Sequence, residues 1–305
     1  MAVFAPVHRV LATGAAVAAL LIAPAPSTAQ EAFLNDALVV ASDADDRRKA
    51  NLASRQVMLV EHMAVAACFL HLGVKSDFWQ PQLERFLALF RATEKALQEG
   101  NAILGLPEER NERVLTSLRQ VDRLFLPYGE ILDDILASGT VSAEQLVALN
   151  DLTDTIENQM GAAVRLIDAV YLRKNYSMKL LTALAFAGKE RVTSQALINE
   201  YCLIAAGVHD KAKRVELRAD ADLYRARLEA LRDGEMLIGL PPAPTPAVAE
   251  QIGVALNEWN KMENVVQVAV EGAEISEADL EAVSEKALVL LASINQTVFL
   301  LEGLE

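Results

Sequence analysis

Apolar residues recur along almost the whole chain at the three- and four-residue spacing of an amphipathic α-helix, and strand-like alternation is absent. Gly and Pro interrupt this pattern rarely, with 14 Gly and 10 Pro in 305 residues. The first half is interrupted near Gly73, Gly100 and Gly139, and the second half in the segments AAGVHDKAK, DGEMLIGLPPAPTP and VEGAEISEAD. Three interruptions divide each half into four predicted helices of roughly 25–35 residues.

Residues typical of helix starts support this division. Ser142 and Ser276 each precede a helical pattern with an acid in its first turn, so we expect both to be N-caps. We expect Pro107 and Pro246 in the first turn of the third helix of each half, where a missing amide hydrogen does no harm. The junction between the halves has no Pro or low-complexity linker, so a tight connection is expected there.

One short sequence segment occurs twice in similar form. GNAILGLP at Gly100 returns as GEMLIGLP at Gly234, a step of 234 − 100 = 134 residues. Without gaps, the same step relates Cys68 to Cys202 and the segment VSAEQL to ISEADL. A repeat that keeps its register over this length indicates a duplicated structural unit.

The register of the repeat defines two homologous units, 36–170 and 171–305. Because each unit contains four helices joined by short connections, each is predicted to be an up-down-up-down four-helix bundle. The predicted fold is therefore all-α, with two four-helix bundles in tandem.

The first 29 residues are typical of a secretory signal peptide. A weakly basic start is followed by the apolar run LATGAAVAALLIA and by small residues, with cleavage expected after Ala29. The alternative is an N-terminal membrane anchor, but the run is short for the ~20 residues that a span requires. Cleavage would leave 305 − 29 = 276 residues. We expect a periplasmic protein in which no later stretch is long and uncharged enough to span a bilayer.

The charge balance restricts the partners. The chain has 42 acidic and 28 Lys or Arg residues, a formal net charge of −14. A field of this sign repels nucleic-acid phosphates and anionic lipids, so neither is an expected partner. An anionic ligand would need a local basic pocket.

Motifs of enzyme sites are missing from the sequence. It has no Gly-rich phosphate loop and no GxSxG, HExxH or CxxC, so neither catalysis nor a cofactor is predicted. Cys68 and His71 lie three residues apart on one predicted helix, near His62, and such a pair can share a metal. However, the second unit has Ala196 at the position that matches His62 and Ala205 at the position that matches His71. We therefore interpret His62, Cys68 and His71 as ordinary helix residues.

The first helix of each unit resembles the opening helix of the PilJ-type, or NarX-like, N-terminal sensor domain, the family found in type IV pili methyl-accepting chemotaxis transducers. The two segments are NLASRQVMLVEHM from Asn51 and AFAGKERVTSQ from Ala185. The shared residues are Asn51, Leu52, Ala53, Arg55, Gln56, Met58, Leu59 and Met63 in the first unit, and Ala187, Gly188, Arg191, Ser194 and Gln195 in the second. The resemblance extends through the Gly-Leu-Pro turn to the closing helix.

The resemblance implies a sensing role. In the nitrate and nitrite sensors of this family, two opening helices meet across a dimer axis, and an Arg from each holds the anion. That Arg matches Arg191 in the second unit but Val57 in the first, and the family's second Arg matches His62 and Ala196. Family receptors are anchored by membrane helices, and we expect no such helix after the signal peptide of this chain. It is therefore expected to present a bound solute to a separate membrane receptor.

The candidate ligand site centres on Arg191, whose guanidinium can bind a small anion through charge-assisted hydrogen bonds. Gly188 allows close helix approach and Ser194 lies one turn on, while Lys189 and Arg55 are weaker candidates. The alternative is that Arg191 extends to solvent or pairs with an acid such as Glu190. An interaction or scaffold protein with a degenerate ligand site is the competing function.

The cysteines leave two arrangements open. If the units pack as an internal pseudo-dimer like the family's, Val57 and Arg191 face the axis. Cys68 and Cys202 then follow at 68 − 57 = 11 and 202 − 191 = 11 residues, about three helical turns, on the same face. A disulfide would then be within reach. Otherwise the units lie end to end and both cysteines are small core residues.

Overall fold

The computed structural model describes residues 45–172 and 176–304. The predicted signal peptide, residues 1–29, and the start of the first unit, residues 36–44, lie outside this range. The described residues are all-α. Their eight long helices are α2 (Asp45–His71), α3 (Ser76–Glu99), α4 (Glu112–Ser138), α5 (Ala143–Ile167), α6 (Met178–Ala205), α7 (Asp210–Asp233), α8 (Pro246–Val270) and α9 (Glu277–Glu302).

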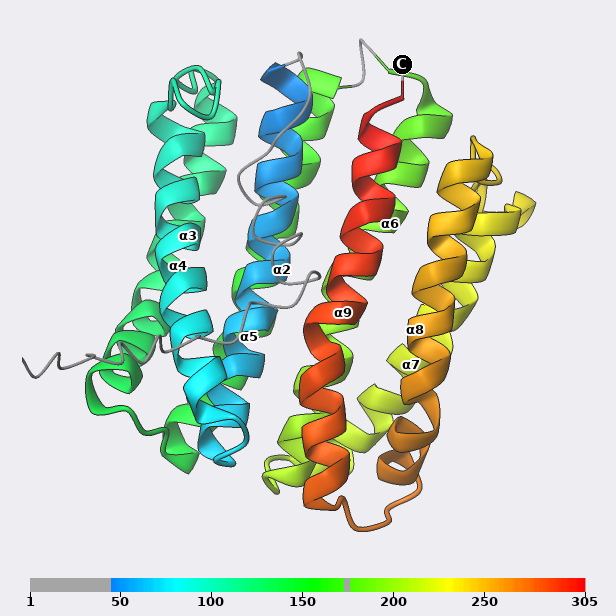
Figure 1. The fold of residues 1–305 in the computed structure, drawn as a ribbon. Helices are drawn as coiled ribbons and strands as arrows, with labels where there is room; N and C mark the ends of the chain where they lie inside the picture. The colour runs from blue at the N-terminus through cyan, green and yellow to red at the C-terminus, as the bar shows by residue number, and fades with distance from the viewer. Residues whose placement is uncertain (1–44, 173–175, 305) are drawn as a thin grey trace, which may run out of the picture.

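The helices pack in two groups of four, α2–α5 and α6–α9, which lie side by side with their axes roughly aligned (Figure 1). Within each group, consecutive helices pack against each other and the fourth helix packs against the first. This arrangement is consistent with two four-helix bundles. Helices α2 and α6 pack together and join the two groups.

The predicted breaks all separate helices, and the two serine caps are confirmed. Ser142 accepts a hydrogen bond from the backbone N–H of Gln145, and Ser276 accepts one from that of Asp279. In both cases the side chain of the third residue accepts from the serine N–H in return, which completes a capping box. Local side-chain chemistry therefore sets these two helix starts.

The expectation for the two prolines was half right. Pro246 is the first residue of α8. Pro107 is not in a helix, because α4 begins only at Glu112. The Asn111 side chain accepts hydrogen bonds from the backbone N–H groups of Arg113 and Val114, and this capping moves the helix start beyond the proline.

The connection between the groups is short, as expected. A π-helical turn, Asp168–Leu172, continues α5 and contains the predicted unit boundary. Helix α6 begins at Met178 behind the N-cap Ser177. Residues 173–175 between them are outside the described range.

The expectation that no later stretch could span a bilayer was wrong for α9, which is long and apolar enough by length and composition. In this structure, 61% of its most apolar 18-residue window is buried, and the helix packs against α6 and α8. The core helix of a soluble bundle passes the same test, since its apolar residues face neighbouring helices.

Candidate functional site

Helices α2 and α6 form a parallel seam between the two groups. The two helices run in the same direction, because successive residues of α2 contact successive residues of α6. The cross-seam pairs, in order, are Asn51–Arg191, His62–Gln195 and Cys68–Cys202.

Residues at seven-residue spacing mark this seam. They are Ser54, Glu61 and Cys68 on α2, and Gly188, Gln195 and Cys202 on α6, each pair being 134 residues apart. This is the spacing of one core position in a parallel coiled coil. None of the six is a large apolar residue, so polar contacts and small side chains determine how the helices meet.

Arg191 lies buried at the N-terminal part of the seam, with 3% of its surface exposed. Its Nη1 donates a hydrogen bond to Asn51 Oδ1 at 3.2 Å, and its Nη2 donates to Ser54 Oγ at 3.0 Å. Asn51 in turn donates through Nδ2 to Glu302 Oε2 at 2.7 Å. The guanidinium of the second group is thus held by neutral oxygens of the first.

This geometry contradicts one part of the alternative interpretation of Arg191, the extension to solvent. The side chain does not extend to solvent, since it is almost completely covered. Glu190 forms its ion pair with Arg227 of α7, at 3.6 Å between Oε1 and Nη1.

Of the other candidate residues, Gly188, Ser194 and Arg55 are buried, whereas Lys189 is exposed. A Cβ on Gly188 would lie 3.1 Å from Ser54 Oγ, so the missing side chain is what lets the helices approach here. Ser194 is fully buried and donates through Oγ to the Arg191 carbonyl oxygen at 2.7 Å. Arg55 is 6% exposed on α2. Lys189 is exposed and is not brought into the seam.

The sequence pattern did not predict the partners that hold Arg191. Asn51 and Ser54 belong to the first unit. In that unit, the resemblance to the sensor family aligned the anion-binding Arg with Val57, not with Asn51 or Ser54. The 134-residue step offered one clue, because it sets Ser54 opposite Gly188. A small residue facing a hydroxyl marks the place where the helices come closest.

The middle of the seam is also polar and buried. His62 donates through Nδ1 to Gln195 Oε1 at 2.5 Å, and burial lowers the pKa of His62 to about 4, so the ring is neutral at pH 7. Gln195 donates onward to the Ala287 carbonyl oxygen of α9. His62 is therefore part of a structural network that links three helices.

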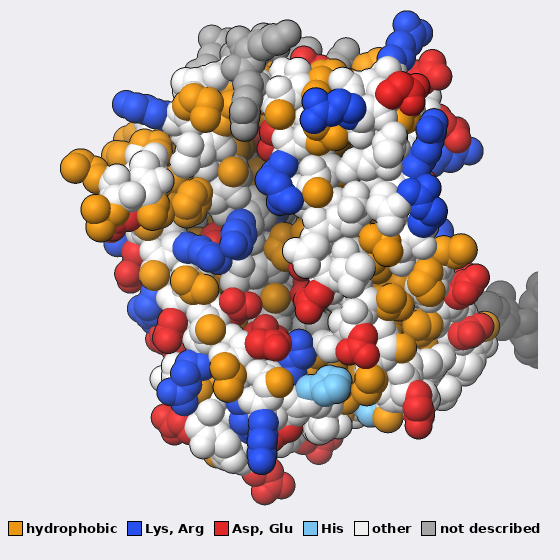
Figure 2. Space-filling model, turned by 180° about the vertical axis from the view of Figure 1, so that it is seen from behind, with side chains coloured by type: hydrophobic (Ala, Val, Ile, Leu, Met, Phe, Trp, Pro, Cys, Tyr) orange, Lys and Arg blue, Asp and Glu red, His pale blue; other side chains and the backbone are white. Residues whose placement is uncertain are grey.

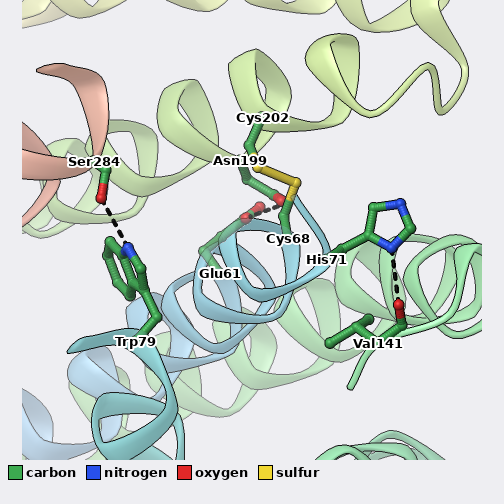
Figure 3. The surroundings of a disulfide bond; sticks show 8 residues. All are labelled: Glu61, Cys68, His71, Trp79, Val141, Asn199, Cys202 and Ser284. Atoms are coloured by element: carbon green, nitrogen blue, oxygen red, sulfur yellow. Dashed lines mark hydrogen bonds between the residues drawn. A yellow bond between two sulfur atoms is a disulfide. The ribbon is translucent and has the colours of Figure 1, made fainter. Parts of the chain in front are cut away.

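A disulfide joins Cys68 to Cys202 at the far end of the seam, with their Cα atoms 6.1 Å apart (Figure 3). Beside it, Asn199 donates to Glu61 Oε2 at 3.0 Å. Of the two arrangements that the sequence left open, the structure has the bridged one. His71 is held by the Val141 carbonyl oxygen, at 2.9 Å from Nδ1.

The histidines and the cysteine considered for a metal are thus each engaged elsewhere. Within residues 45–172 and 176–304, no group of three or more His, Cys, Asp or Glu side chains is placed to hold a metal ion.

Buried carboxyl groups next to the seam were not predicted. Burial raises the pKa of Glu61 to about 7 and that of Glu200 to about 10, and it also raises the pKa of Asp220 on α7. Glu61 and Glu200 each lie in a largely apolar stretch next to one other polar residue, His62 and Asn199 respectively. Figure 2 shows acidic side chains on the face where the two groups meet.

A pocket of about 340 Å³ lies elsewhere, between α3 and α4. The stacked rings of Phe90 and Phe125, whose centroids are 4.0 Å apart, form part of its lining. Glu94 also lines it, is 3% exposed and has its pKa raised to about 8 by burial. None of the candidate residues around Arg191 lines this pocket.

Comparison of the chain with models of protein families, with curated proteins and with solved structures gave no match.

Proposed function

We propose that this chain is an exported, non-catalytic sensor-like protein. It binds a small solute, a nitrate- or nitrite-like anion, at the α2–α6 seam and presents the bound state to a membrane receptor. The resemblance to PilJ-type and NarX-like sensor domains motivates this role. The observation that carries it is the burial of Arg191, 3% exposed, where the opening helices of the two units meet in parallel.

The proposal includes an architecture: two up-down-up-down bundles packed as an internal pseudo-dimer. Two contacts outside the seam support it. Lys75 pairs with Glu285 at 2.5 Å, and His209 lies 3.9 Å from Asp151. Because 209 − 75 = 134 and 285 − 151 = 134, exchanging the two units converts one contact into the other. A two-fold relation between the units has this consequence.

The chemistry around Arg191 suits a small oxyanion. A guanidinium offers several N–H donors in one plane, and its hydrogen bonds to an anion are stronger than those to neutral groups. Asn51 and Ser54 supply neutral acceptors that a bound anion would replace, and Ser54 can also donate its hydroxyl hydrogen. Burial strengthens the attraction, because the local dielectric constant is low.

The disulfide supports export. Structural disulfides persist in oxidising compartments such as the bacterial periplasm. A bridge between Cys68 and Cys202 fits a chain that carries a predicted signal peptide.

A specific observation favours the second candidate, an interaction or scaffold protein with a degenerate ligand site. Val57 stands where the family's Arg would be in the first unit, and the Arg191 donors already have acceptors within the protein. In this case the Arg191 contacts serve only to hold the two units together.

The two candidates are separated by thermal-shift measurements with nitrate, nitrite and other small anions. A ligand at 100 times its dissociation constant should stabilise the fold by about 2.7 kcal/mol. Arg191→Lys keeps the charge but loses the planar fork, and it should abolish the shift while the ligand-free protein remains folded. Arg91→Lys, at a surface ion pair with Asp133, is the matched control and should keep the shift. If no anion shifts the wild-type protein, the scaffold role is supported and the sensor proposal is wrong.

A further inference from the structure

The connections α3–α4 and α7–α8 expose large apolar side chains. Ile103 is 96% exposed in the first, and Met236 and Leu237 are 94% and 95% exposed in the second. Scattered apolar residues at a surface are ordinary, but almost complete exposure of neighbouring large side chains indicates a binding surface. We call these two connections the apolar tips, residues 101–106 and 235–240.

Both tips are built in the same way. An antiparallel bridge closes each one, between Asn101 and Leu106 and between Glu235 and Leu240. Side chains satisfy the tip backbone: Asn101 Oδ1 accepts from the Ile103 N–H, and Glu235 Oε1 accepts from the Leu237 N–H. The backbone of each tip is therefore held by its own hydrogen bonds. Leu106 and Leu240 anchor the tips in the core, whereas Ile103, Met236 and Leu237 are exposed.

The apolar tips lie at the same end of the molecule, the end at which α2 and α6 begin (Figure 1). Ile103 and Leu237 are equivalent under the repeat, since 237 − 103 = 134. In the pseudo-dimer proposed above, on which this inference rests, the two-fold axis runs along the parallel helices α2 and α6 and gives equivalent residues equal height. Met178, at the start of α6, adds a 63% exposed side chain at this end.

We propose that the two apolar tips insert together into the surface of a neutral lipid bilayer. Two convex points at equal height touch a flat surface at once, whereas a globular partner would need two sockets at a matching separation. The space-filling view shows hydrophobic side chains protruding at the upper left, the side of the α7–α8 connection (Figure 2). Interfacial binding of this kind grows with the apolar area that is buried.

Charge selects the type of lipid. The net charge of −14 disfavours anionic headgroups but leaves apolar insertion into a zwitterionic surface unopposed. Binding is therefore strongest on neutral vesicles and changes little with salt there, while salt improves binding to anionic vesicles by screening. This contact is independent of the Arg191 site, so either can fail alone.

The test is co-sedimentation of the protein, as recovered from the exported fraction of expressing cells, with phosphatidylcholine vesicles. Ile103→Ser and Leu237→Ser should each lower the partition coefficient at least about tenfold, and the double variant should stay in the supernatant. The control is Leu126→Ser/Val215→Ser. It removes side chains that are 63% and 70% exposed away from the tips, and it should bind like the wild type.

A second measurement reports insertion directly. Both native tryptophans, Trp79 and Trp259, are fully buried, so a Trp at position 237 reports on the tip. Emission of Leu237→Trp should shift to shorter wavelength when phosphatidylcholine vesicles are added.

Three outcomes would overturn the proposal: wild-type protein that remains in the supernatant, a double tip variant that sediments like the wild type, or an unchanged emission of Leu237→Trp. If the wild type is a dimer without vesicles and the double variant a monomer, the tips join two copies of the chain, and lipid insertion is also wrong.

Discussion

At the scale of single residues, this protein is notable for polar side chains buried without strong ionic partners. Glu94 of α3 is 3% exposed and accepts one hydrogen bond, from Gln56 Nε2 at 3.1 Å. Desolvation raises its pKa to about 8, and the nearby charge of Asp122 adds to the effect. The folded state therefore retains a proton at pH 7 that an exposed carboxyl group loses.

This proton makes stability depend on pH. Between the ordinary pKa of 4.5 and about 8, the unfolded chain releases the Glu94 proton and the folded chain keeps it, so stability falls as pH rises. One proton corresponds to at most about 1.4 kcal/mol per pH unit. Glu94→Gln lacks this loss, so its stability relative to wild type should increase from pH 6 to pH 8 in urea unfolding.

Glu285→Gln is the control for the pH measurement. The hydrogen bond from Lys75 lowers the pKa of Glu285, so this group is ionised in both states above pH 6, and its difference from wild type should not change. If the stability difference between Glu94→Gln and wild type also stays constant from pH 6 to pH 8, Glu94 is ionised in the folded protein.

At the scale of helices, local chemistry determines where a helix begins and ends, but it does not determine which helices contact each other. The two serine caps and Pro246 were predictable because a cap involves residues within one turn. Pro107 was misplaced because Asn111, four residues on, is the stronger cap. Gly188 of α6 gained its meaning only from the helix opposite, since a glycine within a helix is by itself unfavourable.

Two glycines allow a comparison at this scale. Gly253 lies within α8 with open space at its Cβ position, so Gly253→Ala should stabilise the protein by up to about 1 kcal/mol. The same change at Gly188 adds a methyl group 3.1 Å from Ser54 Oγ and 3.8 Å from Arg191 Nη2. Gly188→Ala should therefore stabilise less than Gly253→Ala, or destabilise, in chemical denaturation.

Adding Ser54→Ala to Gly188→Ala should recover part of the difference, because it removes the hydroxyl that the new methyl group meets. Equal gains from Gly188→Ala and Gly253→Ala would mean that the helices do not meet closely at this point.

At the scale of the whole molecule, the α2–α6 seam couples two helix groups whose buried apolar residues belong to one core cluster. The seam has a covalent link at one end, between Cys68 and Cys202, and the Arg191 contacts at the other. Polar seams of this kind specify register, since a slipped pairing would leave buried polar groups without partners.

The disulfide should contribute most at this scale. It closes a loop with a sequence separation of 134, for which the chain-entropy account gives about 5 kcal/mol. Cys68→Ala/Cys202→Ala should lower the free energy of unfolding by about this amount relative to the oxidised protein. Reduced wild type should resemble the variant. Two thiols that react in unfolded, non-reduced protein would show that the bond is absent.

The sequence by itself determined the all-α class, the helix breaks, two of the caps and the 134-residue step, because these depend on periodicity and on neighbours within one turn. It identified Arg191 and Gly188 as candidates but not their partners. The tertiary structure decided that α2 and α6 lie side by side, that Asn51 and Ser54 hold Arg191, and that the cysteines meet. The reason is physical: amphipathic helices of similar composition can pack in several ways, and the choice depends on contacts between residues more than a hundred positions apart.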